Sequence, residues 1–352
     1  MLGLLCTSLK GVAATLLAAL IAGPAATGGT AAPGDAPRET RGVPVFHAAM
    51  IHFHADSAGR YARQGEQVED HGRIVATTVQ LPPRAAGQRM MAHLTLEPVA
   101  KTEREVFDRW DRAGNVRLVT NGRPEIELVR FMTAYGGRTE YDVDVSELAP
   151  LLTGTARLRA HIDTWVSPAW RLSFTLRNVA DTLWDAPQWA APVYYTDSYN
   201  RDSMPRGVET TIEVPRGMKR VVLRYLSSGH CTDGTDEDEF VSKANVISVD
   251  GVVVARVHPW RNDCRAMRER NPYCARWTDG SWSSDYSRSG WCPGDVVTPL
   301  EFDLSDHLGP GRHRVAIRVE DVRPKDAKGH FGYWRISASV IGWDHAPRLW
   351  RN

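Results

Sequence analysis

The sequence has no excess of charge of either sign and no apolar run long enough to cross a membrane. Lys and Arg total 43 against 42 for Asp and Glu, so no overall field attracts a polyanion or an anionic membrane surface. The longest apolar run, residues 11–22, is well short of the roughly 20 residues that a spanning helix needs. Nucleic-acid-binding and membrane-spanning proteins are therefore excluded.

That apolar run lies at the N-terminus and predicts an export signal instead. Lys10 precedes it and small residues follow it at 23–26, which is the layout of a secretory signal peptide over residues 1–26. Gly- and Pro-rich sequence then predicts a disordered leader over residues 27–42. We expect a secreted or periplasmic protein that acts as a monomer.

Cysteine is scarce, and its number is informative. Removing the signal removes Cys6 and leaves four cysteines, and an even number in an exported chain predicts two disulfides. Three pairings are possible, and spacing alone does not choose among them. The alternative, a zinc site with four thiolate ligands, is disfavoured because no closely spaced C-x-x-C pair is present. The four are Cys231, Cys264, Cys274 and Cys292.

Helical periodicity and repeats of 20 to 50 residues are also absent, which excludes solenoids and propellers. Past residue 43 the apolar residues alternate with period two, and turn signals such as Asn121-Gly122 and Asp250-Gly251 separate the runs. This pattern predicts an all-β antiparallel sandwich fold. The weakly alternating, proline-interrupted stretch 181–192 divides the chain, so we expect two domains, residues 43–182 and 188–345. The clearest strands are 74–81, 209–214, 221–226 and 314–319.

Three carboxylates have sequence neighbours that suit a catalytic role. Asp111 lies between Trp110 and Arg112 just before a strand, where an acid can be partly desolvated and yet held in place, as general acid–base catalysis requires. The alternative is a turn aspartate in a surface ion pair. The acidic run at 233–239 lacks the spacing of an EF-hand calcium loop, and Glu239 ends it next to an aromatic residue.

The third acid, Asp163, lies within a stretch, residues 158–165, that can be read as a strand. Alternation would place Arg159, His161, Asp163 and Trp165 on one polar face, either as part of a site or as an ordinary solvated face.

Tryptophans gather in the stretch that also holds three of the cysteines. Indole rings in loops over a β scaffold are typical of sugar-binding clefts, because the ring face covers the C–H face of a pyranose. The alternative is a set of core or edge aromatics held by disulfides. They are Trp260, Trp277, Trp282 and Trp291.

Taken in order, these stretches resemble the secreted bacterial peptide:N-glycosidase F family, amidases that release N-linked glycans from asparagine. The resemblance spans residues 44–343 and implies two eight-stranded jelly rolls side by side, with the site at their interface. The blocks that carry it are Trp110-Asp111-Arg112-Ala113-Gly114-Asn115-Val116, Arg130-Phe131-Met132-Thr133-Ala134-Tyr135, Asp142-Val143-Asp144-Val145, Asp163-Thr164-Trp165, Gly229-His230, Asp238-Glu239-Phe240 and Arg288-Ser289-Gly290-Trp291-Cys292-Pro293-Gly294.

The resemblance implies roles for individual residues. Asp111 is expected to be the principal catalytic carboxylate, Glu239 the acid that contacts the sugar and supports hydrolysis, and Asp163 a third acid that bonds the water network. It implies no metal and no cofactor, and an N-glycosylated peptide or denatured glycoprotein as substrate. It implies a Cys264–Cys292 disulfide, which leaves Cys231 with Cys274. Residues expected to bind substrate are Trp110, Arg112, Trp165, His230, Phe240, Arg288 and Trp291.

Departures from the family pattern keep two rival functions open. Asp163 stands where the family usually has Glu, and Phe240 where it has an indole, which makes a non-catalytic glycan-binding protein conceivable. Arg109 stands where a carboxylate is familiar and would favour ionised Asp111. The other rival is a copper monooxygenase of similar fold, suggested by the ligand-like spacing of His52 and His54; no second such pair accompanies them.

Overall fold

The computed structural model describes residues 42–234 and 237–346, and these form an almost purely β protein. The expected signal peptide and all but the last residue of the expected leader lie outside the described residues. All strand pairs within the sheets are antiparallel, and the all-β prediction is confirmed. Each of the four strands singled out by alternation lies within an observed strand. No helix among the described residues is long and apolar enough to span a bilayer.

The first sandwich consists of two sheets that pack around a shared apolar core. Burial alternates residue by residue along its central strands, because successive side chains point to opposite faces. One sheet has the order β1 (Val43–Ile51), β11 (Trp170–Ala180), β4 (Gln88–Pro98), β9 (Thr139–Asp144). The other has the order β2 (Gln67–Glu69), β3 (Ile74–Leu81), β10 (Gly154–Ile162), β7 (Ala113–Leu118), β8 (Ile126–Met132).

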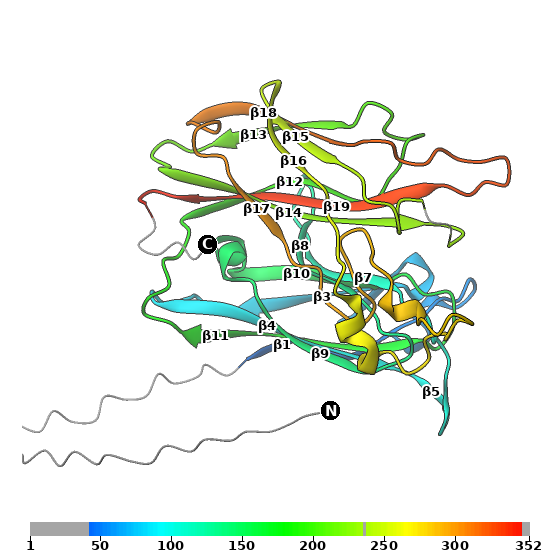
Figure 1. Ribbon diagram of the computed structural model, residues 1–352. Coiled ribbons are helices and arrows are strands. Elements are labelled where there is room, and N and C mark those ends of the chain that lie inside the picture. Colours follow the sequence, from blue (N-terminus) through cyan, green and yellow to red (C-terminus); the bar gives the residue numbers. More distant parts are fainter. Residues whose placement is uncertain (1–41, 235–236, 347–352) are drawn as a thin grey trace, which may run out of the picture. The chain divides into compact units, whose positions relative to one another are not determined.

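The second sandwich has two four-stranded sheets and a core of its own, and it stacks on the first in Figure 1. The sheet nearer the first sandwich has the order β12 (Trp189–Tyr199), β19 (Gly332–Trp343), β14 (Arg220–Cys231), β17 (Leu300–Asp303). The outer sheet has the order β13 (Val208–Val214), β18 (Gly311–Val319), β15 (Asn245–Val249), β16 (Val252–Val257). In the described residues the first sandwich thus has the expected eight strands plus the three-residue β2, and the second has eight.

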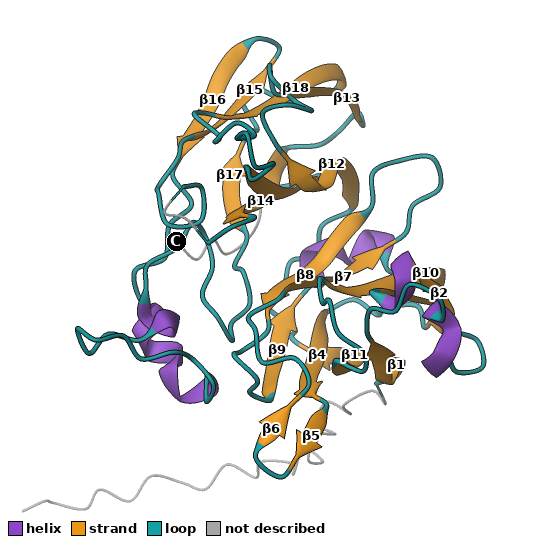
Figure 2. Cartoon of the chain, turned by 90° about the vertical axis from the view of Figure 1, so that its right-hand side faces the viewer, coloured by secondary structure: helices purple, strands orange, loops and turns teal. Residues whose placement is uncertain are grey.

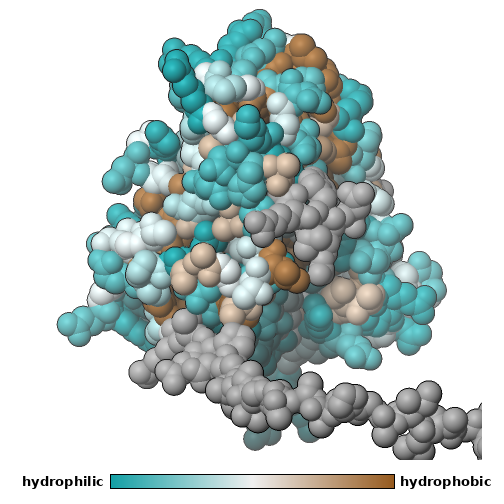
Figure 3. Space-filling view, turned by 90° about the vertical axis from the view of Figure 1, so that its left-hand side faces the viewer, coloured by the Kyte–Doolittle hydropathy of each residue, from teal (hydrophilic) through white to brown (hydrophobic). Residues whose placement is uncertain are grey.

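Short elements decorate the loops. A two-stranded ribbon, β5 (Ala100–Thr102) with β6 (Glu105–Val106), projects from the first sandwich in Figure 2. The helical segments are short 3-10 turns, namely η1 (Ala58–Tyr61), η2 (Asp70–Gly72), η3 (Ser146–Leu151), η4 (Cys264–Arg270) and η5 (Ser283–Asp285). The face drawn in Figure 3 is mainly hydrophilic, with only scattered apolar patches, as expected where an outer sheet turns one side to water.

The two sandwiches meet through polar side chains that are fully buried. Strands β7 and β8 are buried at every position, because β12, β14 and β19 cover the face that the first core leaves free. The Arg224 guanidinium donates to the backbone oxygen of Glu127 at 3.0 Å, and Arg130 donates to that of Arg335 at 2.7 Å. The chain passes once from one set of sheets to the other, so we propose that residues 43–182 and 188–345 are the two domains.

A buried ion pair at this interface leads to a stability prediction. Arg130 and Glu127 are 1% and 0% exposed, and Arg130 Nε donates to Glu127 Oε1 at 3.0 Å. Glu127→Ala should lower the free energy of unfolding by about 3–5 kcal/mol, because it leaves a buried guanidinium unpaired. Guanidinium chloride denaturation, followed by tryptophan fluorescence, measures the loss.

The control for this prediction is an ion pair of the same chemistry on the surface. Glu209 and Arg314 lie 3.7 Å apart and are 59% and 62% exposed, so Glu209→Ala should cost less than about 1 kcal/mol. The double variant Glu127→Leu/Arg130→Met should regain much of the lost stability, since it removes both charges. Equal losses for Glu127→Ala and Glu209→Ala would contradict the prediction.

Candidate active site

Asp111 is positioned by a buried aspartate three residues before it. Asp108 is 1% exposed and accepts hydrogen bonds from the Arg112 Nε at 3.0 Å and from the Thr164 hydroxyl at 2.6 Å. The Thr133 hydroxyl in turn accepts from the Arg112 backbone N–H at 2.8 Å. These bonds hold residues 108–112 at the end of the first sandwich, so that Asp111 lies two residues before β7 with 13% of its side chain exposed.

Glu239 is positioned in a similar way, by Asp238. The Asp238 carboxylate is completely buried and accepts from the Trp334 indole at 2.8 Å and from the Arg323 backbone N–H at 2.9 Å. Of the acidic run, Asp236 lies outside the described residues. The Ser289 backbone N–H donates to the Glu239 carbonyl at 2.8 Å. Glu239 therefore faces away from the core of the second sandwich with 16% of its side chain exposed.

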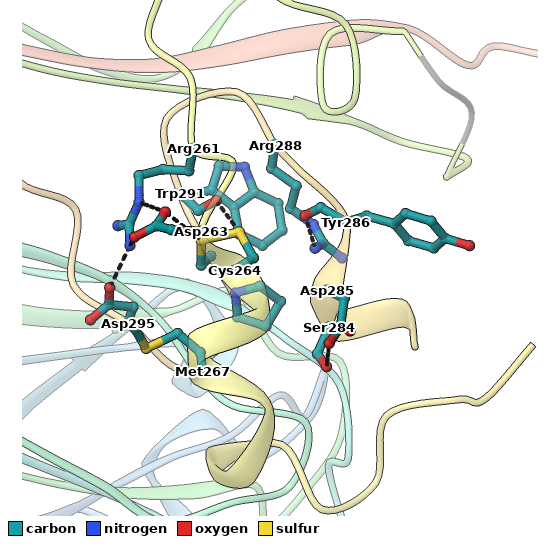
Figure 4. Close-up of a disulfide and its surroundings, with 12 residues drawn as sticks. Arg261, Asp263, Cys264, Met267, Ser284, Asp285, Tyr286, Arg288, Trp291 and Asp295 are labelled. Atoms are coloured by element: carbon teal, nitrogen blue, oxygen red, sulfur yellow. Dashed lines mark hydrogen bonds and ion pairs between the residues drawn. A yellow bond between two sulfur atoms is a disulfide. The ribbon is translucent and has the colours of Figure 1, made fainter. Parts of the chain in front are cut away.

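One guanidinium joins the two acids. Arg288 Nη2 lies 3.7 Å from Asp111 Oδ2, and Arg288 Nε lies 3.4 Å from Glu239 Oε1. Arg288 is 2% exposed, and its guanidinium carbon lies 5.0 Å from the ring centroid of Phe240 and 4.7 Å from that of Trp291. Figure 4 shows Arg288 beside Trp291, with Tyr286 extending away from them. Two carboxylates from different sandwiches thus share one fixed cation.

Burial raises the pKa of both carboxyl groups. For Asp111 the desolvation outweighs the opposing effects of Arg288 and of a hydrogen bond from Tyr135. For Glu239 burial and the negative charge of Asp111 outweigh the opposing effect of Arg288, so that the pKa is raised to about 7. Both acids therefore keep a proton to higher pH than an ordinary carboxylic acid, and the charge of Asp111 acts on Glu239, which is the property of an acid–base catalyst.

Tyr135 is a member of this group that the sequence analysis did not single out. Its hydroxyl bonds Asp111 and accepts from Arg288 Nη2 at 3.4 Å. The side chain of Asn271 accepts from the Tyr135 backbone N–H at 2.8 Å, so a loop of the second sandwich fixes the Tyr135 segment. Tyr135 lies three residues after β8, and nothing in the local sequence there indicates a contact with an acid.

Asp163 lies near this pair but bonds other cations. Its carboxylate is 3.1 Å from Arg73 Nη1 and 3.5 Å from Arg335 Nη2, and its backbone N–H donates to the Ala113 carbonyl at 2.9 Å, which ties it to the start of β7. Strand β10 ends at Ile162, so the expected alternation does not extend to Asp163 or beyond.

Two of the residues predicted with Asp163 have different surroundings. His161 is buried, and desolvation lowers its pKa to about 4; it is therefore neutral at pH 7 and not part of a solvated face. Trp165 is 57% exposed, with the Arg73 guanidinium 4.5 Å from its ring centroid. One indole face is thus covered by a cation.

Two cavities adjoin at the acid pair, which lines both of them. We call the one of about 1190 Å³ the larger cavity and the one of about 680 Å³ the smaller cavity. Asp163, Trp165, His230 and Trp291 line only the smaller cavity, and Trp110, Phe240 and Arg288 line only the larger. The residues that line both are Asp111, Arg112, Cys231, Thr232 and Glu239. Every residue expected in the site from sequence thus lines one of two adjoining hollows.

Two of the aromatic side chains that line the smaller cavity are fixed by packing and hydrogen bonding within the protein. His230 is buried between Trp291 and Tyr333, with ring centroids 5.4 and 5.2 Å away, and burial holds its pKa well below the usual value. Trp291 is only 3% exposed, and its indole donates to the Gly229 carbonyl at 2.9 Å. Both rings therefore stiffen the wall behind the acids.

The other clustered tryptophans divide into two kinds. Trp260 and Trp277 are 37% and 52% exposed and line the larger cavity. Trp282 does not line it; Arg268 and Arg276 lie 5.1 and 5.6 Å from its ring centroid and hold it in the loop.

The cysteines form one disulfide, not two, among the described residues. Cys264 and Cys292 are bonded and join η4 to the loop that carries Trp291, as the resemblance implied. The expected second bond, between Cys231 and Cys274, is wrong, since both remain thiols. Cys231 Sγ instead lies 3.5 Å from Glu239 Oε2, to which it donates.

The histidines behind the copper alternative are engaged elsewhere. Strand β1 ends at Ile51, so neither histidine lies on it. His52 is 1% exposed, and its ring nitrogens lie 3.0 Å from the Ala58 carbonyl and 3.2 Å from the Ser167 hydroxyl. Within the described residues, the one grouping with metal-like ligand spacing is Asp233, Asp326 and His330, at the surface.

Sequence comparison identifies the relatives of this chain. Models of the N-terminal and C-terminal parts of peptide-N-glycosidase F match residues 119–178 and 198–341. Over 263 residues the chain is 24% identical to peptide-N(4)-(N-acetyl-beta-D-glucosaminyl)asparagine amidase F of Elizabethkingia miricola, with 68% of this chain and 71% of that protein covered. The two matched regions fall in the first and second sandwich.

Solved structures show the same fold. The structure of PNGF-II superposes with a TM-score of 0.78 at 25% identity, covering 90% of this chain and 67% of that one. PNGase F, described as a glycosylasparaginase from Flavobacterium meningosepticum, superposes with a TM-score of 0.66 at 20% identity, covering 86% and 95%. The double sandwich is therefore shared along most of the described chain.

Proposed function

Because the chain belongs to the peptide-N-glycosidase F family, we propose that it is a hydrolase that cleaves the amide bond between N-acetylglucosamine and asparagine in N-glycoproteins and glycopeptides. The products are the glycan as its glycosylamine and a peptide with aspartate in place of asparagine. The observation that carries the proposal is the placement of Asp111 and Glu239 on one buried guanidinium, at the line where two cavities meet.

The proposed reaction uses Asp111 for both proton transfers. Its carboxylate takes a proton from a water molecule as the water oxygen attacks the amide carbon of the substrate. The protonated Asp111 then donates to the leaving nitrogen as the C–N bond breaks. One water is consumed, the asparagine side chain becomes a carboxylic acid and the sugar leaves as an amine. Each proton step is assigned to a side chain, so the proposal calls for no cofactor.

The remaining residues position the substrate in this proposal. Ionised Glu239 accepts a hydrogen bond from a hydroxyl of the first sugar. The positive charge of Arg288 stabilises the negative charges of both acids. Trp165 offers its uncovered indole face to a pyranose ring. Asp163 is held by Arg73 and Arg335 and acts on the water network. Trp110, Arg112, Phe240, His230 and Trp291 shape the walls.

Mass spectrometry of a defined glycopeptide tests the proposal directly. Incubation in ¹⁸O-labelled water should give a peptide that has lost its entire glycan and carries one labelled oxygen in the new aspartate. A peptide that keeps its first sugar would identify cleavage within the glycan instead. Binding of the glycopeptide without any product would favour the rival function, a glycan-binding protein.

We propose further that the protein is exported and acts as a monomer.

Tyr135→Phe should lower kcat about tenfold with little change in KM, because it removes one hydrogen bond that stabilises ionised Asp111. The same loss should move the acidic limb of the pH–rate profile to higher pH, since that bond lowers the pKa of Asp111. Steady-state kinetics across pH checks both effects. Tyr141→Phe is the matched control: its buried hydroxyl donates to the Gly294 carbonyl, away from the acids, so it should leave the position of the limb unchanged.

A further inference from the structure

The larger cavity differs in chemistry from the smaller one. Apart from the residues that line both cavities, it has no acidic side chain, and its charges are the cations Arg109 and Arg288. Several aromatic rings line it, and four are well exposed: Trp110 at 50%, Trp277 at 52%, Tyr286 at 39% and Trp260 at 37%. Such a group of apolar surfaces around a hollow marks a place where another molecule binds.

The smaller cavity has the opposite character. Its lining includes two arginines and two aspartates that form ion pairs. Arg73 lies 3.1 Å from Asp163, and Arg335 lies 3.5 Å from Asp163 and 3.3 Å from Asp197. Carboxylates and guanidinium groups fixed in this way suit a ligand with many hydroxyl groups, because each hydroxyl both donates and accepts. Trp165 supplies one exposed ring beside them.

Because the two acids line both cavities, their position decides which part of the substrate each cavity can bind. If the proposed function is correct, on which this inference rests, the substrate consists of a polypeptide and a glycan joined at the bond that Asp111 and Glu239 attack. The two halves must then extend from the acid pair in different directions. We propose that the larger cavity is a polypeptide subsite, which binds apolar side chains next to the glycosylated asparagine, while the first sugars occupy the smaller cavity.

Trp277 is the residue best placed to define this subsite. Its backbone N–H donates to the Ser281 carbonyl at 2.9 Å, and the Gly280 N–H donates to the Trp277 carbonyl at 3.0 Å, which closes a tight turn. Arg268 and Arg276 hold Trp282 at the base of this turn. The exposed indole is thus carried on an ordered support, so binding orders little new structure.

Reciprocal variants test the assignment by equilibrium binding. The probes are N,N′-diacetylchitobiose and an unglycosylated peptide with Phe and Leu on either side of an Asn-Ala-Thr sequence, both titrated by calorimetry. Trp277→Ala should weaken peptide binding about tenfold, the size expected for an aromatic anchor. It should change the affinity for chitobiose less than about twofold. Trp165→Ala should do the reverse, and Leu183→Ala, exposed and outside both cavities, should change neither.

The opposite result would overturn the inference. If Trp277→Ala weakens chitobiose and leaves the peptide unaffected, the larger cavity is a sugar site. If the wild-type protein does not bind the peptide at millimolar concentration, there is no polypeptide subsite. Glycan release is measured separately: release without peptide binding refutes only this inference, whereas peptide binding without release from any glycopeptide refutes only the proposed function.

Discussion

Asp111→Asn should lower kcat/KM for glycan release by about three to four orders of magnitude, the upper part of the range for loss of a general acid–base group. Asparagine has the shape of aspartate but cannot take the proton of the attacking water or return it to the leaving nitrogen. In this variant Arg288 pairs with Glu239 alone. Glu239 is therefore held more tightly in place and cannot take over the proton transfers of Asp111. Kinetics on a fluorescent glycopeptide, with released glycan quantified, measures the effect.

The control is the same substitution at the third acid. Asp163→Asn should reduce kcat/KM only about tenfold, because Asp163 bonds Arg73 and Arg335 and not the Arg288 that joins the catalytic pair. The Asp111→Asn protein should still bind chitobiose, since the smaller cavity is intact. If Asp111→Asn keeps more than a tenth of the wild-type activity, or if Asp163→Asn is the more damaging change, Asp111 is not the proton carrier.

Glu239→Gln should lower kcat/KM by about two to three orders of magnitude and change its dependence on pH. The proposed function needs ionised Glu239, whose pKa is about 7, so wild-type activity should rise as the pH increases through 7. In the variant that limb should disappear, because the carboxyl group with a pKa of about 7 has been replaced by an amide that does not titrate. A pH series of kcat/KM for both proteins is the measurement.

Protein stability supplies the control for Glu239→Gln. The pKa of Glu239 is higher in the folded protein than the ordinary value of 4.5 for a glutamate side chain, so the folded state binds the proton more tightly. Its contribution to stability is complete below about 4.5 and is lost as the pH rises to about 7. Glutamine has no charge to bury, so the variant should be at least as stable as the wild type at pH 8. Lower activity together with a lower melting temperature would point to misfolding instead.

The sequence was sufficient for the fold class because alternation with period two is a local property. Residues 74–81 show it, and they are strand β3 to the residue. The same reasoning failed after Ile162, where the strand stops. The Asp163 N–H still bonds the Ala113 carbonyl in register with β7, but the Thr164 N–H turns back to the Ile162 carbonyl at 2.8 Å. The alternation of apolar and polar residues does not indicate where the pairing of a strand with its neighbour ends.

The Cys231 thiol shows the same limit for long-range contacts. Even cysteine number and family resemblance suggested a second disulfide, but its sulfur lies against Glu239, and burial raises its pKa to about 12. Tyr135 is the converse case, a residue with no signal of its own that bonds the principal acid. Both outcomes depend on which loops of the two sandwiches meet.

By itself, then, the sequence determined that this is a two-sandwich β protein, and its order of short blocks identified the acids and the aromatic residues of the proposed site. Tertiary structure alone decided that Asp111 and Glu239 share the Arg288 guanidinium, that two unlike cavities open from them, and that both acids have raised pKa values. The physical reason is that strand formation follows from side chains a few residues apart, whereas desolvation and charge pairing depend on groups that only packing of the two sandwiches brings together.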